Sequence, residues 1–316
     1  MKQGNVMQGS GHGQRTMGRR GVLVGIAAGL TLNPGLQSVP VAVGRDATPA
    51  FTPEDPLVDA AWLRERLGDG ALLPVGFMPP DEFAAGHIPG SVQLDWPELE
   101  LADTSDAAVA EWETSVSAIL GDRGITTESD VVVYDNDTLF AARLWWLLRY
   151  LGHERVHMLD GGLAAWKEAG GDIVDGESVP TATSPYPGTP APDTLAQLDE
   201  VLDALGRDDV VIIDARTEAE FEKRHIPGTV NVNYPLNAAE TSPRTWLPRA
   251  DLLALYESVG VTPDKLVIPY CSSGVRSAVT AFTLHMIGFE RVALYTGSWN
   301  EWNAHPGTPK EPGGPT

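Results

Sequence analysis

The 316-residue chain has little sulfur and little positive charge. It has one cysteine, and its 22 Lys and Arg face 43 Asp and Glu, giving a formal net charge of −21. One cysteine excludes an intramolecular disulfide and any site built from several thiolates, and seven scattered histidines do not suggest zinc. A strongly acidic protein is repelled by nucleic acid and by anionic membranes. We therefore expect no metal, no nucleic acid and no membrane among its partners.

The N-terminal segment has the opposite charge, since no acidic residue precedes Asp46. Arg19 and Arg20 stand directly before an apolar run over 21–32. A basic pair before a short apolar run is typical of a secretory signal of the twin-arginine type, and 12 residues are fewer than the ~20 that span a membrane. Residues 1–50 are interpreted as a signal-like or disordered leader. Export to the periplasm or outside and a cytoplasmic location both stay open.

Proline divides the rest of the chain into two blocks. Residues 171–192 contain five prolines mixed with Thr, Ser and Gly, a composition that stops helices and strands and predicts an extended linker. The blocks on either side, 51–170 and 193–305, are similar in length. The Pro- and Gly-rich tail over 306–316 is predicted to be disordered.

The two blocks are repeats of one another. Residues 82–90 recur at 220–228, an interval of 138, and later matches all keep an interval of 136. A register held over this distance indicates a duplicated domain. His87 and His225 occupy matching places in the repeat, so we expect them to shape a turn. The later matches are Val131–Tyr134 with Val267–Tyr270, Gly152 with Gly288, Glu154–Val156 with Glu290–Val292, Gly161 with Gly297, and Trp166 with Trp302.

Strand-like and helix-like segments alternate within each block. In the second block, short β-rich apolar runs at 210–213, 266–268 and 291–295 are separated by helical segments such as 249–259 and 277–287. This alternation predicts an α/β fold with two tandem domains, each a parallel sheet flanked by helices. Ligands bind such sheets at the carboxyl ends of the strands.

Cys271 stands at such a strand end. The apolar run 266–270 precedes it, and the short loop Cys271–Arg276 leads into the helical segment 277–287. Loop amides, the helix N-terminus and a nearby guanidinium would all stabilise a thiolate there. A lone cysteine is often a buried apolar filler, but its position after a strand, with Gly274 and Arg276 close behind, favours a nucleophile.

The length of the loop separates two kinds of chemistry. Tyrosine-type phosphatases and arsenate reductases share the strand–Cys–loop–helix unit, but they have five residues between cysteine and arginine, a cradle for a tetrahedral oxyanion. Here four residues separate Cys271 from Arg276. The shorter loop suits a single sulfur atom, as in a persulfide. A Cys-dependent phosphatase and a non-catalytic sulfur carrier stay as less favoured alternatives.

The motifs of both blocks resemble those of one family. In the first block they are Gly86-His-Ile-Pro-Gly90 and Leu159-Asp-Gly-Gly162 with Trp166; in the second they are Asp214-Ala-Arg216, Glu220-Phe221, His225-Ile-Pro-Gly228, Cys271-Ser-Ser-Gly-Val-Arg276-Ser277, and Gly297-Ser-Trp299 with Trp302. Both blocks resemble the rhodanese domain, and roughly residues 56–305 resemble tandem-domain sulfurtransferases. In that family the first domain is inactive and the second bears the catalytic cysteine. Asp135 occupies the position that matches Cys271 by register, so the first block has no thiol there, as in that family.

The resemblance implies a reaction and the residues that perform it. Cys271 would take a sulfane sulfur from a small anionic donor and pass it, as a persulfide, to a thiophilic acceptor such as cyanide or a thiol. No cofactor is implied, and we expect a monomer. Arg216 is the first candidate for holding the donor, with a structural ion pair to Glu220 or a neighbouring acid as the alternative. The loop residues Ser272, Ser273, Gly274, Val275 and Arg276 complete the predicted substrate site.

Two questions about the site stay open at this level. Arg276 either binds the donor or braces the loop through a carboxylate. Family members that use thiosulfate tend to have basic residues directly after the cysteine, whereas those that use 3-mercaptopyruvate have small neutral ones. Ser272 and Ser273 are closer to the second pattern, and Arg276 departs from both. We favour thiosulfate as the donor, with 3-mercaptopyruvate as the alternative.

Overall fold

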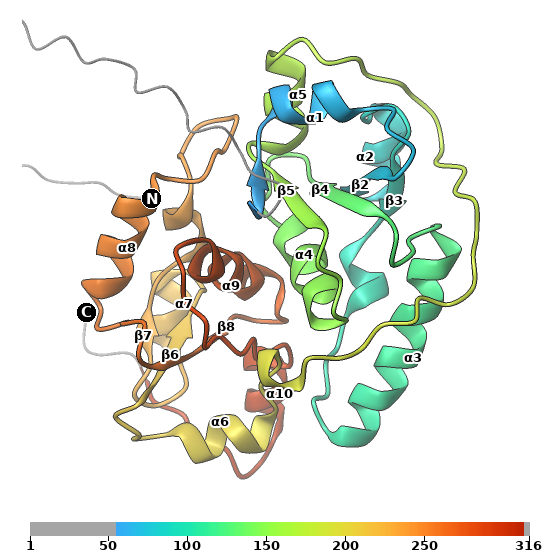
Figure 1. Cartoon of the computed structure of the whole chain (residues 1–316). Coiled ribbons are helices and arrows are strands. Elements are labelled where there is room, and N and C mark those ends of the chain that lie inside the picture. The colour runs from blue at the N-terminus through green and yellow to red at the C-terminus, as the bar shows by residue number, and fades with distance from the viewer. Residues whose placement is uncertain (1–54, 313–316) are drawn as a thin grey trace, which may run out of the picture. The chain divides into compact units, whose positions relative to one another are not determined.

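The computed structural model describes residues 55–312, and the predicted leader over 1–50 lies outside them (Figure 1). The described part of Pro49–Thr316 belongs to one compact unit. It contains no helix long and apolar enough to cross a membrane. Within residues 55–312, no three or more His, Cys, Asp or Glu side chains gather closely enough to hold a metal ion.

The first copy is a five-stranded parallel sheet with helices on its faces. Its strands lie in the order β1-β5-β4-β2-β3. The central strand β4 is valine-rich and almost entirely buried, as expected of a strand covered on both sides. The elements are β1 (Leu57–Val58), α1 (Ala60–Arg66), β2 (Leu72–Phe77), α2 (Pro80–Ala85), β3 (Val92–Leu94), η1 (Trp96–Leu99), α3 (Asp106–Asp122), β4 (Asp130–Tyr134), α4 (Ala141–Tyr150), β5 (Val156–Leu159) and α5 (Gly162–Glu168).

The second copy has a smaller parallel sheet in the order β7-β6-β8. Strand β8 ends one residue before Cys271, so the cysteine lies at the carboxyl edge of a sheet, as predicted. Both copies confirm the predicted α/β fold. The elements are η2 (Pro192–Thr194), α6 (Leu198–Ala204), β6 (Val210–Asp214), α7 (Glu218–Lys223), β7 (Val230–Asn231), η3 (Tyr234–Asn237), α8 (Arg249–Glu257), β8 (Leu266–Tyr270), α9 (Val275–Met286) and α10 (Ser298–Ala304).

The strand predicted over 291–295 is wrong as a full strand. This segment makes only isolated bridges, one of them between Val267 and Val292. It still donates to β8, since the amide of Ala293 bonds the Val267 carbonyl and that of Tyr295 bonds the Pro269 carbonyl. Proline has no N–H, so Pro269 returns no hydrogen bond to the segment and the ladder is interrupted.

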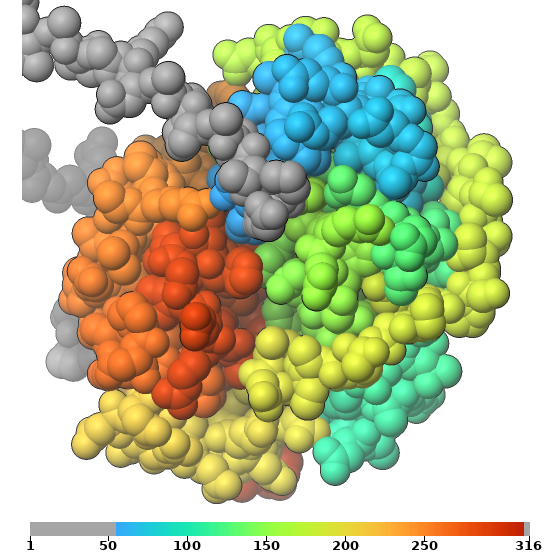
Figure 2. Space-filling model, viewed as in Figure 1, coloured from blue at the N-terminus to red at the C-terminus, as the bar shows by residue number. Residues whose placement is uncertain are grey.

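The two segments rich in proline are both held against the domains. The linker over 171–192 contains no helix or strand before η2, and it runs along the surface of the first copy (Figure 2). Tyr186 fastens it, because this side chain is buried and its hydroxyl lies 2.9 Å from His153 Nδ1. The prediction of a disordered tail from residue 306 is wrong for residues 306–312. Glu311 forms a β-bridge with His225 and Pro309 accepts a bond from the Trp302 indole, so backbone pairing outweighs the Pro- and Gly-rich composition.

Helices α4 and α9 join the copies. Trp145 of α4 packs edge-on against Phe282 of α9, with ring centroids 4.9 Å apart, and both helices are largely buried. Because α4 starts after the loop that contains Asp135 and α9 starts after the loop that contains Cys271, this packing brings equivalent helices of the repeat together. The two copies therefore share one apolar core cluster.

Candidate active site

Cys271 is held at the carboxyl end of β8 by its own backbone. The residue is 1% exposed, and its Sγ accepts a hydrogen bond from the Gly274 amide at 3.2 Å. Its amide donates to Ser298 Oγ at 3.1 Å, and its carbonyl accepts from the Trp299 amide at 2.9 Å. The cysteine predicted as the nucleophile is therefore held between the residue that precedes α9 and the first residues of α10.

The tight turn after Cys271 depends on Gly274. This residue precedes α9 with φ +86°, a left-handed conformation that favours glycine. A Cβ placed there would lie 3.0 Å from both Cα and the carbonyl oxygen of Thr296. Glycine lets the chain turn into α9. The first amides of this helix have no partner within it and point towards the Cys271 loop.

Arg276 braces the loop. Its guanidinium donates to both carboxylate oxygens of Glu220, at 2.8 and 2.9 Å, and to Ser272 Oγ at 2.7 Å. Hydrogen bonding by Arg276 lowers the pKa of Glu220 to about 2. Glu220 is itself part of a capping box with Thr217 at the start of α7. Of the two roles open for Arg276, the structure shows the loop brace, and α7 supplies the carboxylate.

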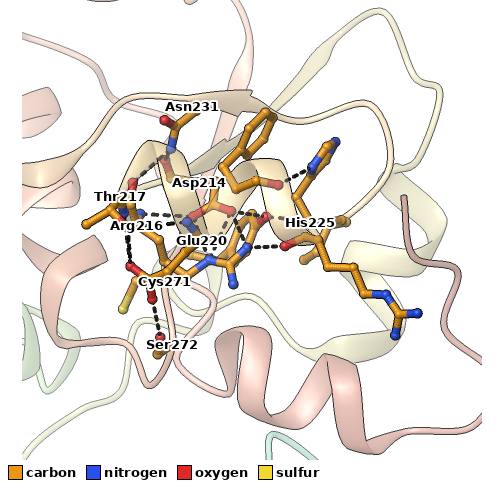
Figure 3. A network of polar contacts seen from close by, with 12 residues as sticks. Asp214, Arg216, Thr217, Glu220, His225, Asn231, Cys271 and Ser272 are labelled. Carbon is orange, nitrogen blue, oxygen red and sulfur yellow. Dashed lines mark hydrogen bonds and ion pairs between the residues drawn. The ribbon is translucent and has the colours of Figure 1, made fainter. Parts of the chain in front are cut away.

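Arg216 forms a buried ion pair with Asp214, the last residue of β6. Its Nε and Nη2 donate to the carboxylate at 2.6 to 3.0 Å, and Nη2 also donates to the Arg224 carbonyl at 2.8 Å. Burial lowers the pKa of Arg216, but the hydrogen bonds and charge of Asp214 outweigh it, so the pKa is raised. The Tyr270 hydroxyl donates to the same carboxylate at 2.6 Å, and the Trp299 ring lies 4.7 Å from the guanidinium carbon. The structure thus shows the neighbouring-acid alternative, with Asp214 rather than Glu220 as the acid (Figure 3).

The remaining predicted substrate residues belong to the same loop. Ser272 and Ser273 are partly exposed, and Val275 is the buried first residue of α9. Ser272 Oγ accepts from Arg276, so this hydroxyl is part of the brace. Ser273, the next residue of the loop, takes no part in the hydrogen bonds between Arg276, Glu220 and Ser272.

Ser298 has a role that sequence reasoning missed, although the motif that contains it was noticed. Its side chain is completely buried, accepts from the Cys271 amide and donates to the Tyr295 carbonyl at 2.7 Å. Its φ is +55°, an uncommon conformation for a residue with a side chain. Because Ser298 follows Cys271 by 27 residues, only the folded chain shows that it holds the backbone of Cys271.

Arg143 is a second residue that the sequence did not reveal, and it belongs to the first copy. It lies in the first turn of α4, is 2% exposed, and donates from Nη2 to the Leu99 carbonyl at 3.0 Å. Its Nη1 is buried without a hydrogen-bond partner among the described residues. Burial lowers the pKa of Arg143 to about 10, and the negative charges of Cys271 and then of Glu100 act against that shift. An arginine of the first copy thus lies close enough to Cys271 to interact with it electrostatically.

In the first copy a carboxylate occupies the place of the thiol. Asp135 is buried and accepts hydrogen bonds from the Thr138 amide at 3.0 Å and the Ala141 amide at 2.8 Å. Burial raises the pKa of Asp135, and these amides act in the opposite direction. By register, Gly76, Met78 and Phe140 stand where the second copy has Asp214, Arg216 and Arg276. The first copy therefore lacks the thiol and both arginine pairs of the second.

The histidine of each repeat is used in the same way. His87 donates from Nδ1 to the Phe83 carbonyl at 2.9 Å and stacks on that ring, with centroids 3.8 Å apart. His225 makes the same two contacts with Phe221, at 2.8 and 3.8 Å. Identical contacts in a copy without a nucleophile agree with a role in the turn.

Comparison with known proteins agrees with this geometry. Residues 59–169 and 197–305 match the rhodanese-like domain. The chain is 32% identical over 264 residues to the thiosulfate sulfurtransferase of Pseudomonas aeruginosa, covering 81% of this chain and 96% of that protein. It is 29% identical over 310 residues to thiosulfate/3-mercaptopyruvate sulfurtransferase 2 of Arabidopsis thaliana, covering 84% and 90%. The crystal structure of SseA from Escherichia coli, a 3-mercaptopyruvate sulfotransferase, matches with a TM-score of 0.68 and 29% identity over 77% of this chain and 98% of that chain. The chain therefore belongs to the rhodanese family, with two copies of its domain.

Proposed function

We propose that this protein is a thiosulfate sulfurtransferase that works through a persulfide on Cys271. The observation that carries the proposal is the geometry of the Cys271 loop. The sulfur of Cys271 is buried at the carboxyl end of β8 and accepts a hydrogen bond from the Gly274 amide. Relatives at about 32% identity over most of the chain are named for the same activity. The donor is a small anion and the acceptor a thiophile such as cyanide or a thiol.

In the first half-reaction the Cys271 thiolate attacks the sulfane sulfur of thiosulfate. A Cys271 S–S bond forms, the S–S bond of thiosulfate breaks, and its electron pair leaves with sulfite. One thiolate and one dianion become one persulfide anion and one dianion, so charge is conserved. The loop amides, beginning with that of Gly274, are placed to receive the negative sulfur.

In the second half-reaction the acceptor attacks the outer sulfur of the persulfide. With cyanide, a C–S bond forms, the S–S bond breaks, and its electron pair returns to Cys271 as the thiolate, leaving thiocyanate. No proton is needed in either half-reaction, and no other group changes its oxidation state. This is a ping-pong reaction, because the first product leaves before the acceptor reacts.

The predicted donor-binding residues have unequal support. Arg276 and Ser272 are occupied with each other and with Glu220, so they hold the loop in shape around the sulfur. The hydrogen bonds of Arg216 use Nε and Nη2, and its Nη1 makes none with the described residues. We keep Arg216 as a donor contact through Nη1, together with the amides of Gly274, Val275 and Arg276.

A second donor, 3-mercaptopyruvate, is favoured by a specific observation. The two residues after the nucleophile, Ser272 and Ser273, are small and neutral, and no basic side chain directly follows Cys271. The relative from Arabidopsis thaliana is named for both donors. With this donor the chemistry at Cys271 is the same, and the leaving group is the enolate of pyruvate, which takes a proton from water.

Steady-state thiocyanate formation tests the proposal. The wild type, Cys271→Ala and the matched first-copy variant Asp135→Asn are each assayed with thiosulfate and with 3-mercaptopyruvate, using cyanide as the acceptor. We expect turnover with thiosulfate that Cys271→Ala abolishes and Asp135→Asn retains. Turnover with 3-mercaptopyruvate but not with thiosulfate would show that 3-mercaptopyruvate is the donor. If neither donor gives thiocyanate that depends on Cys271, the proposed sulfurtransferase activity is wrong. Release of phosphate from p-nitrophenyl phosphate would instead support the phosphatase alternative.

A further inference from the structure

We propose that Arg143, from helix α4 of the first copy, binds the negatively charged end of the sulfur donor beside Cys271. The copy without a nucleophile then completes the active site of the other. This inference rests on the proposed sulfur transfer, and it adds a substrate-binding residue from the opposite domain. It assigns the ligand by its chemistry, a sulfonate or carboxylate attached to the sulfur that is transferred.

The first support is an unpaired donor in a buried place. Arg143 is 2% exposed, yet its Nη1 has no hydrogen-bond partner among the described residues. Its other terminal nitrogen, Nη2, donates to the Leu99 carbonyl. Burying N–H groups of a charged guanidinium without partners is costly, so such groups are usually satisfied by protein, water or a ligand. An anion at Nη1 would satisfy them.

The second support is the location of Arg143 relative to the two packed helices. Arg143 lies one turn or less from the start of α4, and its charge interacts with Cys271, which begins the loop that leads into α9. Arg149, six residues further along α4, instead interacts with His285 near the end of α9 and lines a cavity of about 460 Å³ with it.

Phe140, which directly precedes α4, has its ring centre 5.8 Å from that of Tyr234, whose amide donates to the Ala215 carbonyl. The Ala215 amide in turn donates to the carbonyl of Tyr270, the residue before Cys271. The start of α4, and Arg143 with it, therefore lies on the side of the second copy where β8 ends at Cys271.

The third support is charge. Arg276 forms a two-point ion pair with Glu220, and Arg216 forms one with Asp214. Each of these guanidiniums is already countered by a carboxylate. Arg143 makes no ion pair within residues 55–312, and Glu100, the acid that influences it, is exposed to solvent.

The aromatic surroundings of Arg143 fix its position without neutralising it. The guanidinium carbon lies 4.6 Å from the ring centre of Trp146 and 5.9 Å from that of Trp112. Cation–π contacts hold a guanidinium by its flat faces and leave the N–H groups at its edge free to donate. Arg143 is thus built as a fixed cation in a protein whose net charge is −21. A doubly charged donor needs such a local attraction to enter.

Alkylation of Cys271 tests this assignment without using sulfur transfer. Iodoacetate and iodoacetamide both react with the thiolate by displacing iodide, but only iodoacetate carries a carboxylate next to the reacting carbon. Second-order rate constants are measured for both reagents, and their ratio is divided by the ratio for free cysteine under the same conditions. Because Cys271 is the one cysteine of the chain, mass spectrometry reports a single site.

We expect the normalised ratio of the wild type to exceed one, despite the negative charge of the protein. In Arg143→Gln it should fall by roughly tenfold or more, the usual size of losing a hydrogen bond to a charged group. Arg143→Lys, which keeps the charge, should retain a ratio above one. Arg149→Gln is the matched control on the same helix and should behave as the wild type.

The outcomes separate this inference from the proposed function. A wild-type ratio below one would overturn the role of Arg143 even if Arg143→Gln does not fold. A folded Arg143→Gln protein with an unchanged ratio would do the same. If the ratio behaves as expected while neither thiosulfate nor 3-mercaptopyruvate gives thiocyanate, the anion site stands and the proposed sulfur transfer falls.

Discussion

Ser298 holds the backbone of Cys271 while its own backbone adopts a conformation that is uncommon for a residue with a side chain. Its hydroxyl accepts the Cys271 amide, and its φ of +55° is one that glycine adopts more easily. Both features belong to one residue, so two substitutions can separate them. Ser298→Ala removes the hydrogen bond and keeps the strain, whereas Ser298→Gly removes both.

We predict that Ser298→Ala lowers the free energy of unfolding by about 1–3 kcal/mol, since it leaves the buried Cys271 amide without an acceptor. Ser298→Gly should be less destabilising than Ser298→Ala by several tenths of a kcal/mol or more. Urea unfolding monitored by tryptophan fluorescence measures both values. Equal losses in the two variants would show that the backbone of Ser298 is not strained.

The pair of Glu220 and Arg276 makes a pH-dependent contribution to stability. Arg276 lowers the pKa of Glu220 from 4.5 to about 2. A carboxyl group whose pKa is lowered by folding stabilises the fold above its unfolded pKa and loses that effect as the pH falls towards its folded value. We predict that wild type and Glu220→Gln differ most in stability above pH 4.5 and converge as the pH falls to about 2. A difference that persists at the lower end of this range would contradict this account.

At the scale of residues, the sequence predicted the nucleophile and its loop and did not predict their supports. Cys271 follows a strand and precedes a helix, a local pattern that is legible in the sequence. Arg143 and Ser298 reach Cys271 from distant elements, and nothing in their neighbours along the chain indicates it. The sequence also did not show that Asp214, two residues before Arg216, accepts hydrogen bonds from its Nε and Nη2, which leaves only Nη1 for a donor.

Helix α9 depends on the residue that precedes it. The left-handed φ of Gly274 is strained for any residue with a side chain, and a Cβ there would press against the Thr296 backbone at 3.0 Å. We predict that Gly274→Ala lowers the free energy of unfolding by about 1–2 kcal/mol and reduces kcat/KM roughly tenfold or more, because the amide that bonds the Cys271 sulfur must shift. Unfolding and steady-state assays of one preparation measure both. Gly288→Ala is a suitable control, since its φ is also positive but a Cβ at this residue would meet no heavy atom within 4 Å.

Element boundaries were predictable where local rules are strong. Strand β8 has the predicted bounds Leu266–Tyr270, because a short apolar run of this kind is typical of a buried strand in a parallel sheet. The strand expected over 291–295 is reduced to bridges by Pro269, which lies on the neighbouring strand. The prediction used the composition of the segment alone, whereas pairing depends on the partner.

Contacts between the copies should make stability depend on Asp160. This carboxylate of the first copy accepts a hydrogen bond from the Trp246 amide of the second at 2.9 Å, and burial raises its pKa to about 6. When folding raises the pKa of a carboxyl group, the free energy of unfolding falls as the pH rises from the unfolded pKa, 3.8, through the folded pKa, about 6.

We therefore predict that Asp160→Asn, which keeps the acceptor and removes the charge, stabilises the protein by roughly 1–3 kcal/mol at about pH 7 and has little effect near about pH 3.5. Thermal unfolding across this pH range measures the difference between the two proteins. A destabilising effect at neutral pH would show that the ionised carboxylate is favoured in the interface.

The repeat in the sequence predicted the architecture of the whole molecule, with two domains of one fold. It did not predict how they meet, because the residues at the seam differ between the copies. Trp145 of α4 faces Phe282 of α9, whereas the residue that matches Trp145 by register is the small Ala281. The tail after residue 305 was also misjudged, since its partner at His225 lies far away in sequence.

The buried carboxylate of Asp135 accepts two loop amides in the first copy, at the place that Cys271 occupies in the second. One of its oxygens accepts the amide three residues ahead at 3.0 Å, as the Cys271 sulfur does at 3.2 Å. The other oxygen accepts the Ala141 amide at 2.8 Å, and in the persulfide that we propose for Cys271 its counterpart would be the outer sulfur atom. That atom would then meet the amide of Ser277, which matches Ala141 by register. The Asp135 loop would thus be a permanent counterpart of the sulfur-loaded form that we propose for the Cys271 loop.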